Sequence, residues 1–132
     1  MTDNPALYVL KARVLERGRL FGIDIENNAE LDAWHKAWHK AIVLRPAWPY
    51  SWSDYARARS QYSLIDRSFT AALLRASKLG PWEPRVLENS ALFSFHYQGW
   101  LSDGLQAALD NSYQKLVKAY PHSARKIGRQ YQ

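Results

Sequence analysis

The sequence contains no cysteine, and this absence excludes several kinds of chemistry. Without thiols the 132-residue chain cannot form disulfides, use a thiolate nucleophile or bind zinc through cysteine. The compartment stays open, because periplasmic proteins can also lack cysteine. Residues 1–18 have too short an apolar run and too many charges for a signal peptide or a membrane span. We therefore expect a soluble domain, which would be periplasmic or membrane-associated if a native N-terminal anchor has been removed.

Motifs of the common enzyme classes are also missing. The sequence has no G-x-S-x-G nucleophile motif and no glycine-rich phosphate loop, and most of its 6 glycines are expected at helix ends. No serine has a neighbouring base in a recognisable pattern, and nothing in the sequence brings the carboxylates of Asp66 and Glu88 together. We therefore expect no catalytic residues, no cofactor and no enzymatic activity.

The chain is rich in aromatic and basic residues. It contains 6 tryptophans and 8 tyrosines, and its formal net charge is +6. Its length fits one compact domain, residues 1–132, with a hydrophobic core. The positive charge favours an anionic partner such as nucleic acid, acidic polysaccharide or a lipid surface, without choosing among them.

Helix signals dominate the sequence, and no segment shows the alternation of a strand. Asn4, Asn28, Ser63 and Ser102 (or Asp103) are the expected cap residues, and residues 22–28 form a polar loop. Glu83–Pro84 is expected to open a further helix. The expected helices span residues 6–18, 29–44, 50–62, 64–79, 85–98, 103–120 and 123–131.

Two segments end in the same pattern 35 residues apart. AIVLRP, which ends at Pro46, and ASKLGP, which ends at Pro81, both fit A-x-x-L-x-P. A third, looser unit ends at Pro121. The same 35-residue shift pairs apolar residues with each other: Trp34 with Phe69, Trp38 with Leu73, Ala41 with Ala76, Trp52 with Leu87 and Ala56 with Ala91.

These features resemble a divergent tetratricopeptide-repeat (TPR-like) protein, whose repeat is a helix hairpin of about 34 residues. Trp52 and Ala56 match the large and small positions of a first helix, and Phe69 and Ala76 match positions of a second helix. The resemblance implies an all-α fold, a right-handed TPR-like stack of about three antiparallel helix hairpins followed by a short C-terminal helix.

Four residues depart from the repeat pattern. Tyr55 and Arg59 replace the expected leucine and tyrosine, and Trp34 and Phe69 stand where alanine is usual. We expect these departures to affect the superhelical geometry and to leave the pairing of the helices intact.

A narrower resemblance covers residues 44–131. The segments LRPAWPYSWSDYARARSQ and FTAALLRASKLGPWEPRVLE, followed by Trp100 near a helix end, are similar to the VpsP-type proteins of bacterial exopolysaccharide clusters. The block LGPWEP, residues 79–84, is the most specific part. The resemblance implies a small, non-catalytic accessory factor of exopolysaccharide biosynthesis or export. Such proteins are often preceded by one membrane anchor, which residues 1–132 do not show, and this chain has few acidic residues near its end.

The tetrapeptide AWHK occurs twice in succession, at residues 33–40. On a helix, a four-residue repeat places each residue type in its own stripe. His35 and His39, four residues apart, have the spacing of a two-histidine metal site. However, Lys36 stands where the metalloprotease motif requires glutamate, Lys40 adds a second positive charge, and no third ligand is identifiable. We therefore expect a solvated flank of histidine and lysine, and no metal site.

The alanines and tryptophans of this repeat have a packing explanation. Alanines at positions 33, 37 and 41 allow two helices to approach closely, and the adjacent rings of Trp34 and Trp38 fill the remaining volume. We expect both tryptophans in the core.

The GPWEP block, residues 80–84, also has a structural explanation. Gly80 is expected to end a helix in the left-handed conformation, and Pro81 prevents the helix from continuing. Glu83 faces the N-terminus of the next helix, which Pro84 begins. We expect Trp82 to pack under the turn.

Two basic regions are the candidate partner-binding sites. In a TPR-like stack the first helices line the concave face, which would present Arg13, Arg17, Arg57, Gln61, Arg85, Glu88 and His96. Ser53 and Asp54 interrupt the Lys/Asn pattern with which TPR proteins clamp a C-terminal carboxylate, so that ligand is not expected. The second region follows Asp110, the last acidic residue, and contains Lys115, Lys118, Arg125, Lys126 and Arg129.

These regions predict a protein–protein interaction adaptor that docks on an acidic surface of a membrane-bound assembly component. Self-association remains a second possibility, because the abundant aromatic residues suit a dimer interface as well as a core. The alternative is a basic nucleic-acid-binding helical protein, in which Tyr113, Tyr120 and Tyr131 would stack on bases.

Overall fold

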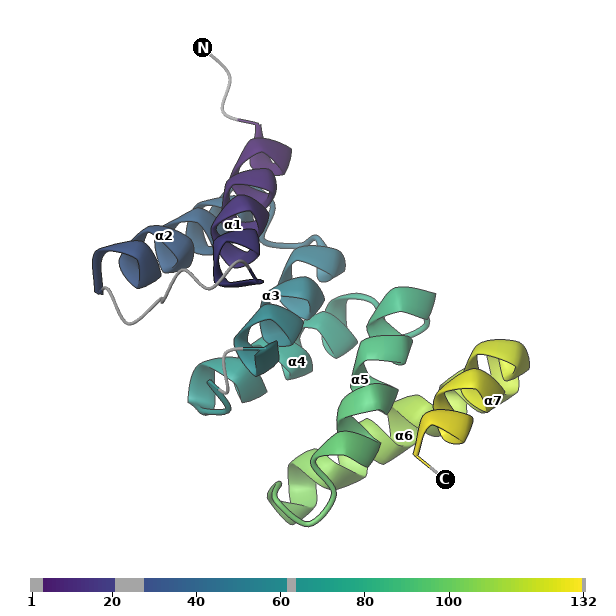
Figure 1. The fold of residues 1–132 in the computed structure, drawn as a ribbon. Coiled ribbons are helices and arrows are strands. Elements are labelled where there is room, and N and C mark those ends of the chain that lie inside the picture. Colours follow the sequence, from purple (N-terminus) through teal and green to yellow (C-terminus); the bar gives the residue numbers. More distant parts are fainter. Residues whose placement is uncertain (1–3, 21–27, 62–63, 132) are drawn as a thin grey trace.

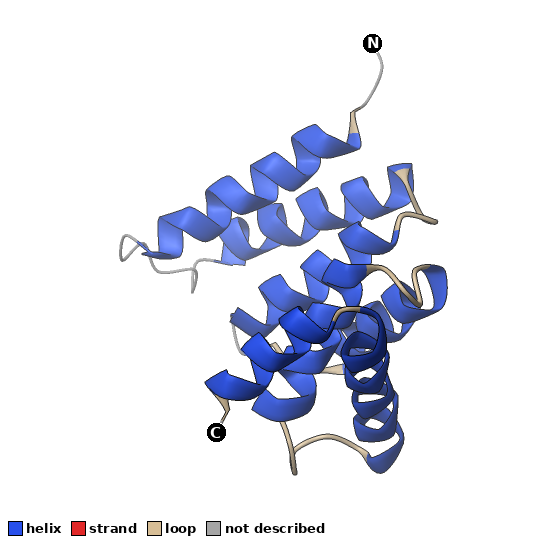
Figure 2. Cartoon of the chain, turned by 90° about the vertical axis from the view of Figure 1, so that its right-hand side faces the viewer, coloured by secondary structure: helices blue, strands red, loops and turns tan. Residues whose placement is uncertain are grey.

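The computed structural model describes residues 4–20, 28–61 and 64–131, and every regular element in them is an α-helix (Figure 1, Figure 2). The prediction of an all-α fold is therefore confirmed. Most of the predicted polar loop, residues 22–27, lies outside the described part of the chain. The helices are α1 (Pro5–Leu20), α2 (Asn28–Leu44), α3 (Pro49–Gln61), α4 (Arg67–Leu79), α5 (Pro84–His96), α6 (Asp103–Ala119) and α7 (Pro121–Gln130).

Local signals account for most helix starts. Helices α1, α3, α5 and α7 each begin with proline, whose fixed φ suits the first turn and whose missing N–H is not needed there. Asn4 and Ser102 accept hydrogen bonds from the backbone N–H of Ala6 and Leu105, at 3.0 and 3.3 Å, as predicted for cap residues.

The start of α4 differs from the prediction. The helix begins at Arg67, and its cap is Asp66 instead of Ser63. The Asp66 carboxylate accepts the Phe69 N–H at 3.2 Å and also binds Arg59, a residue of α3. A contact with α3 therefore helps to make Asp66 the cap residue of α4.

Gly80 ends α4 for a different reason than predicted. Its φ is −134°, so it does not adopt the left-handed conformation. A β-carbon at this position would lie 2.9 Å from side-chain carbons of Pro49 and 2.8 Å from Glu83 Cγ. Glycine is therefore required by the close approach of Pro49, the first residue of α3, and of Glu83.

Neighbouring helices form three hairpins. The most extensive contacts join α1 to α2, α3 to α4 and α5 to α6, and α7 lies against α5 and α6 (Figure 1). We call α1, α3 and α5 the first helices. The hairpins are linked in turn, because α2 contacts α3 and α3 contacts α5.

In the described residues the core forms three clusters that follow the hairpins along the chain. The α1–α2 cluster contains Ala12, Trp34, Ala37 and Trp38, together with Ala58 of α3. The α3–α6 cluster contains Ala56, Phe69, Ala72, Leu73, Phe93, Leu105 and Leu109. The α5–α7 cluster contains Leu87, Ala91, Leu116, Ala124 and Ile127. Each hairpin thus buries its apolar face partly within itself and partly against the next one.

The 35-residue period is present in the structure. Helices α3 and α5 both have 13 residues and begin at residues 49 and 84, while α2 and α4 end at residues 44 and 79. Four of the five predicted pairs are buried at both positions, and only Trp52 of the fifth is partly exposed. The repeat in sequence therefore corresponds to a repeat in helix position and burial.

Candidate functional site

The two tryptophans of the AWHK repeat are completely buried, as predicted. Their indole N–H groups both donate to Glu16 Oε1 of α1, Trp34 at 2.8 Å and Trp38 at 3.1 Å. The alanines at positions 37 and 41 are buried beside them. Glu16 satisfies two buried donors at once, and the sequence contained no signal for this role except its place on the facing helix.

The two histidines of the repeat have different environments. His39 is exposed, as predicted, but His35 is partly buried, with its Nδ1 3.3 Å from the Tyr55 hydroxyl and 3.4 Å from Arg59 Nη1. Burial and the positive charge of Arg59 lower the pKa of His35, against the opposing effect of Asp32 and Asp66. The prediction of a solvated flank is therefore wrong for His35.

The two first-helix departures from the repeat pattern, Tyr55 and Arg59, contact each other. Arg59 is buried, and its guanidinium donates to the Tyr55 hydroxyl at 2.9 Å and to Asp66 Oδ2 at 2.5 Å. Partial burial alone would raise the pKa of Asp66, but hydrogen bonds from the Phe69 N–H and Arg59, together with the Arg59 charge, lower it. This polar group therefore joins α2, α3 and the start of α4 where a TPR-like pattern would place apolar contacts.

A second polar group lies on the face of the first helices and joins all three of them. Asp54 of α3 accepts ion pairs from Arg13 of α1 and Arg85 of α5, each at 3.2 Å. Arg57 Nη1 lies 3.5 Å from Asn89 Oδ1 of α5. We call Arg13, Asp54, Arg57 and Arg85 the arginine cluster.

The arginine cluster borders two hollows. The first has a volume of about 310 Å³, and its lining also includes Glu16, Ala58 and Gln61. The second has a volume of about 260 Å³ and shares Arg13, Asp54 and Arg85 with the first. Its other lining residues are Pro5, Ala6, Val9, Arg45, Trp48, Tyr50 and Ser51. A polar hollow and a partly apolar one therefore meet at the Arg13–Asp54–Arg85 bridge.

Aromatic rings hold two of the cations beside the second hollow. The Arg85 guanidinium lies 4.5 Å from the Tyr50 ring centroid, and the Arg45 guanidinium lies 5.5 Å from that of Trp48. The Tyr50 hydroxyl donates a short hydrogen bond to Glu83, which raises the pKa of Tyr50. These contacts orient the arginines toward the surface.

The electrostatics of the cluster favour an anionic ligand. The Asp54 side chain is 14% exposed, whereas those of Arg13 and Arg85 are about half exposed, at 51% and 52%. Burial raises the pKa of Asp54, and the charges of Arg85, Arg13 and Arg57 oppose this shift. Two guanidinium groups, those of Arg13 and Arg85, thus share one carboxylate and keep access to solvent, while Arg57 adds a third positive charge nearby. Guanidinium groups that are partly exposed to solvent can bind a further carboxylate or a phosphate.

The structure brings together some of the predicted partner-binding residues and separates others. Arg13, Arg57, Gln61 and Arg85 line the first hollow. Glu88 and His96 of α5 do not line it, and the side chain of Arg17 lies outside the described part of the chain. His96 Nδ1 instead lies 3.5 Å from the hydroxyl of Tyr131.

Sequence reasoning missed Asp54 as the centre of the site and noted it only as an interruption of a pattern. Asp54, Arg57 and Gln61 are spaced three and four residues apart, so they lie on one face of α3. Arg13 of α1 and Arg85 of α5 line the same hollow as this face. That spacing was the available signal.

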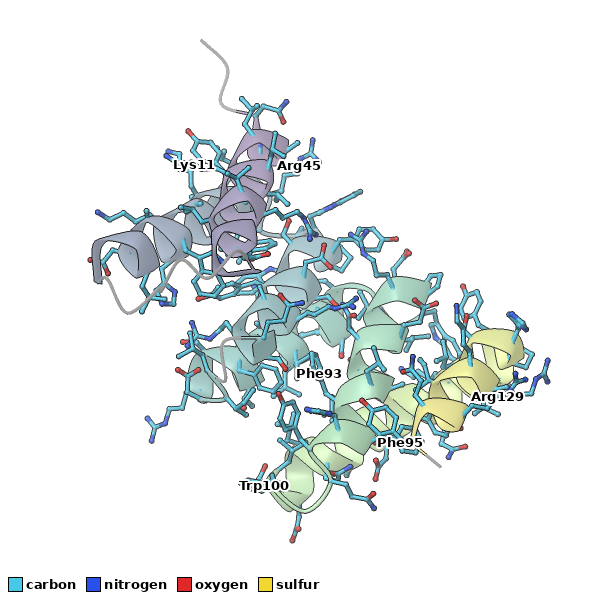
Figure 3. The ribbon with its side chains drawn as sticks, viewed as in Figure 1. Lys11, Arg45, Phe93, Phe95, Trp100 and Arg129 are labelled. Carbon is cyan, nitrogen blue, oxygen red and sulfur yellow. The ribbon has the colours of Figure 1, made fainter. Side chains whose placement is uncertain are left out.

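The predicted C-terminal basic residues form a separate region on α6 and α7. Ala124 and Ile127 are buried, which leaves Arg125, Lys126 and Arg129 exposed on the other side of α7. Figure 3 shows Arg129 on the outer side of this helix, far from Lys11 and Arg45 in the first hairpin. Lys118 is exposed, while Lys115 Nζ lies 5.2 Å from the ring centroid of Trp82. Trp82 is 48% exposed, so the prediction that it packs under the turn is wrong.

The C-terminal tyrosines have partners within the chain. The Tyr113 ring contacts Phe95 edge-on, with the ring centroids 4.9 Å apart, and the Tyr131 ring stacks on Phe95 at 5.5 Å. The Tyr120 hydroxyl donates to the Trp82 carbonyl at 3.3 Å. Each of the tyrosines predicted to stack on bases thus has a contact within the chain, and Tyr131 is still 40% exposed.

Comparisons of the chain with protein-family models, curated protein sequences and solved structures found no match. None of the helices in the described residues combines the length and apolar composition needed to cross a bilayer. The same residues contain no group of three or more histidine, aspartate or glutamate side chains placed to hold a metal ion.

Proposed function

We propose that this protein is a non-catalytic adaptor that binds an acidic segment of a partner protein at the arginine cluster. The observation that carries this proposal is the convergence of Arg13, Arg57 and Arg85, one from each first helix, on one hollow, where Arg13 and Arg85 both pair with Asp54. Residues spaced far apart in sequence are held on one face, as a docking surface requires.

The physical basis is charge combined with aromatic contact. Asp or Glu side chains of the partner would pair with the exposed sides of Arg13 and Arg85, while Trp48 and Tyr50 offer ring surface in the adjoining hollow. The charges would increase the encounter rate, and the aromatic contacts would lengthen the lifetime of the complex.

In this proposal the three hairpins form a TPR-like stack whose first helices line the concave face. The partner is a membrane-bound component of bacterial exopolysaccharide assembly. The polysaccharide part rests on the resemblance of the LGPWEP block and its flanks to VpsP-type proteins, and the adaptor part rests on the arginine cluster.

The test is affinity capture from a polysaccharide-producing bacterium with three tagged proteins: the wild type, Arg13→Gln/Arg85→Gln, and the control Arg125→Gln/Arg129→Gln. We expect the wild type and the control to enrich the same membrane assembly protein. The cluster variant should lose at least about tenfold, because hydrogen bonds to charged groups contribute about 1.5–3 kcal/mol each. Failure to enrich any membrane assembly component, or undiminished capture by the cluster variant, would contradict the proposal.

A second candidate function, nucleic-acid binding, is favoured by the exposed basic face of α7. It predicts binding to DNA or RNA that weakens steeply with salt. Replacing Lys115, Lys118, Arg125, Lys126 and Arg129 would then reduce the salt dependence, whereas Arg13→Gln/Arg85→Gln would leave it unchanged.

A further inference from the structure

The loop between α5 and α6 holds a tryptophan out in solvent. Trp100 is 87% exposed, the largest exposure among the large apolar side chains described. Its backbone N–H donates to the Tyr97 carbonyl at 2.9 Å, and Gly99 before it has a φ of +86°, so the turn is ordered. Figure 3 places Trp100 at the opposite end of the molecule from α1. An ordered turn thus presents a large apolar ring that the core does not use.

Trp100 stands at the edge of an apolar hollow. This hollow, of about 500 Å³, lies between α4 and the start of α6 and is separate from those at the arginine cluster. Two more apolar side chains in its lining are exposed, Ile65 by 37% and Leu74 by 44%. The exposed apolar residues therefore form a continuous patch and are not scattered singly.

The border of this patch is basic. Helix α4 exposes Arg67, Arg75 and Lys78 as well as Leu74, and Arg67 also lines the hollow. Of the two nearby carboxylates, Asp66 is paired with Arg59, which leaves Asp103 at the start of α6. The patch therefore combines protruding apolar side chains with a net positive border.

We propose that this surface, made by Trp100, Ile65, Leu74 and the three cations of α4, docks on an anionic phospholipid bilayer. A tryptophan at the tip of a loop suits the boundary between headgroups and acyl chains, where its ring is apolar and its N–H is solvated. Arg67, Arg75 and Lys78 complement the charge of anionic headgroups, and each cation near such a surface strengthens binding. This inference does not depend on the proposed adaptor function, because it uses other residues.

The experiment measures flotation of the full-length protein with vesicles of phosphatidylglycerol and phosphatidylcholine, and with vesicles of phosphatidylcholine alone. We expect binding to the anionic vesicles and little to the neutral ones. Trp100→Ala should weaken binding about tenfold, and each of Arg67→Gln, Arg75→Gln and Lys78→Gln about fivefold. Lipids brominated in the acyl chains should quench wild-type tryptophan fluorescence more than that of Trp100→Ala.

Two variants serve as controls. Trp48→Ala removes another exposed tryptophan from a different loop, and Arg125→Gln/Lys126→Gln/Arg129→Gln removes three charges from α7; both should bind vesicles like the wild type. The proposal is overturned if anionic vesicles do not bind, or if the α7 variant loses as much binding as the α4 variants. The vesicles contain no protein, so neither result bears on the adaptor proposal.

Discussion

Individual residues determine how closely the helices of this protein approach each other. Glu16 accepts hydrogen bonds from two buried indoles, which lets α1 pack directly on Trp34 and Trp38 without leaving a donor unpaired. Gly80 allows the end of α4 to touch Pro49, at the start of α3. In both cases a small set of atoms sets the distance between two elements.

Replacing Gly80 with alanine should destabilise the protein by about 1–3 kcal/mol, because the added methyl group would overlap Pro49 and Glu83 in a packed turn. The matched control is Gly104→Ala in α6, where an added β-carbon meets nothing within 4 Å. The control should be unchanged or up to about 1 kcal/mol more stable. Urea unfolding followed by circular dichroism measures both, and equal effects of the two substitutions would contradict the close-approach explanation.

At the scale of the helix, the start of α4 combines a cap with an ion pair. Asp66 accepts the Phe69 N–H through one carboxylate oxygen and binds the buried Arg59 through the other. Asp66 therefore caps α4 and at the same time binds this helix to α3. Its loss would remove a local interaction and a long-range one together.

Asp66→Ala should lower the free energy of unfolding by about 2–3 kcal/mol. This is less than for a fully buried pair, because half of the Asp66 side chain is exposed to water. Asp66→Asn keeps an oxygen that can accept the Phe69 N–H but loses the charge, so it should be about 1 kcal/mol more stable than the alanine variant. Chemical denaturation gives both values, and identical losses would show that the cap contributes nothing.

At the scale of the whole molecule, contacts within each hairpin are more extensive than contacts between hairpins. Between hairpins, polar groups add to the apolar clusters: the Arg13–Asp54–Arg85 bridge, the buried Asn89–Ser53 hydrogen bond of 2.8 Å, and His35 beside Tyr55 and Arg59. In repeat architectures such interfaces between units control how cooperatively the chain unfolds.

The His35 contact makes this connection sensitive to pH. The pKa of His35 lies below its ordinary value of 6.5 in the folded protein, so the unfolded chain takes up the proton first as the pH falls. The part of the stability that depends on neutral His35 is therefore present above pH 6.5 and decreases as the pH falls from 6.5 through the lower pKa of the folded state. We expect the Tm to fall between pH 7.5 and 5.5, and to fall less in His35→Asn.

His39→Asn is the control, because His39 is exposed on the same helix and should keep the wild-type pH dependence. Calorimetry of the three proteins across this range makes the comparison. A fall in Tm of the same size in His35→Asn would rule out His35 as its source.

The helical fold and much of its core were predictable from the sequence, for local reasons. Proline, cap residues and apolar spacing act within one or two turns, so they placed most helix ends to within a few residues. Trp34 and Trp38 were predicted to lie in the core, and the 35-residue period paired them with Phe69 and Leu73; all four are buried.

The tertiary structure decided what depends on distant residues. The conformation of Gly80 follows from the approach of Pro49, the cap of α4 from Arg59, and the partial burial of His35 from Tyr55. The sequence indicated a basic face on the first helices, but only the packing of the hairpins placed Asp54 between Arg13 and Arg85. The sequence by itself thus determined the helices, their period and their buried positions, because these follow from local spacing. The structure decided which charges meet, because that depends on how separate helices pack.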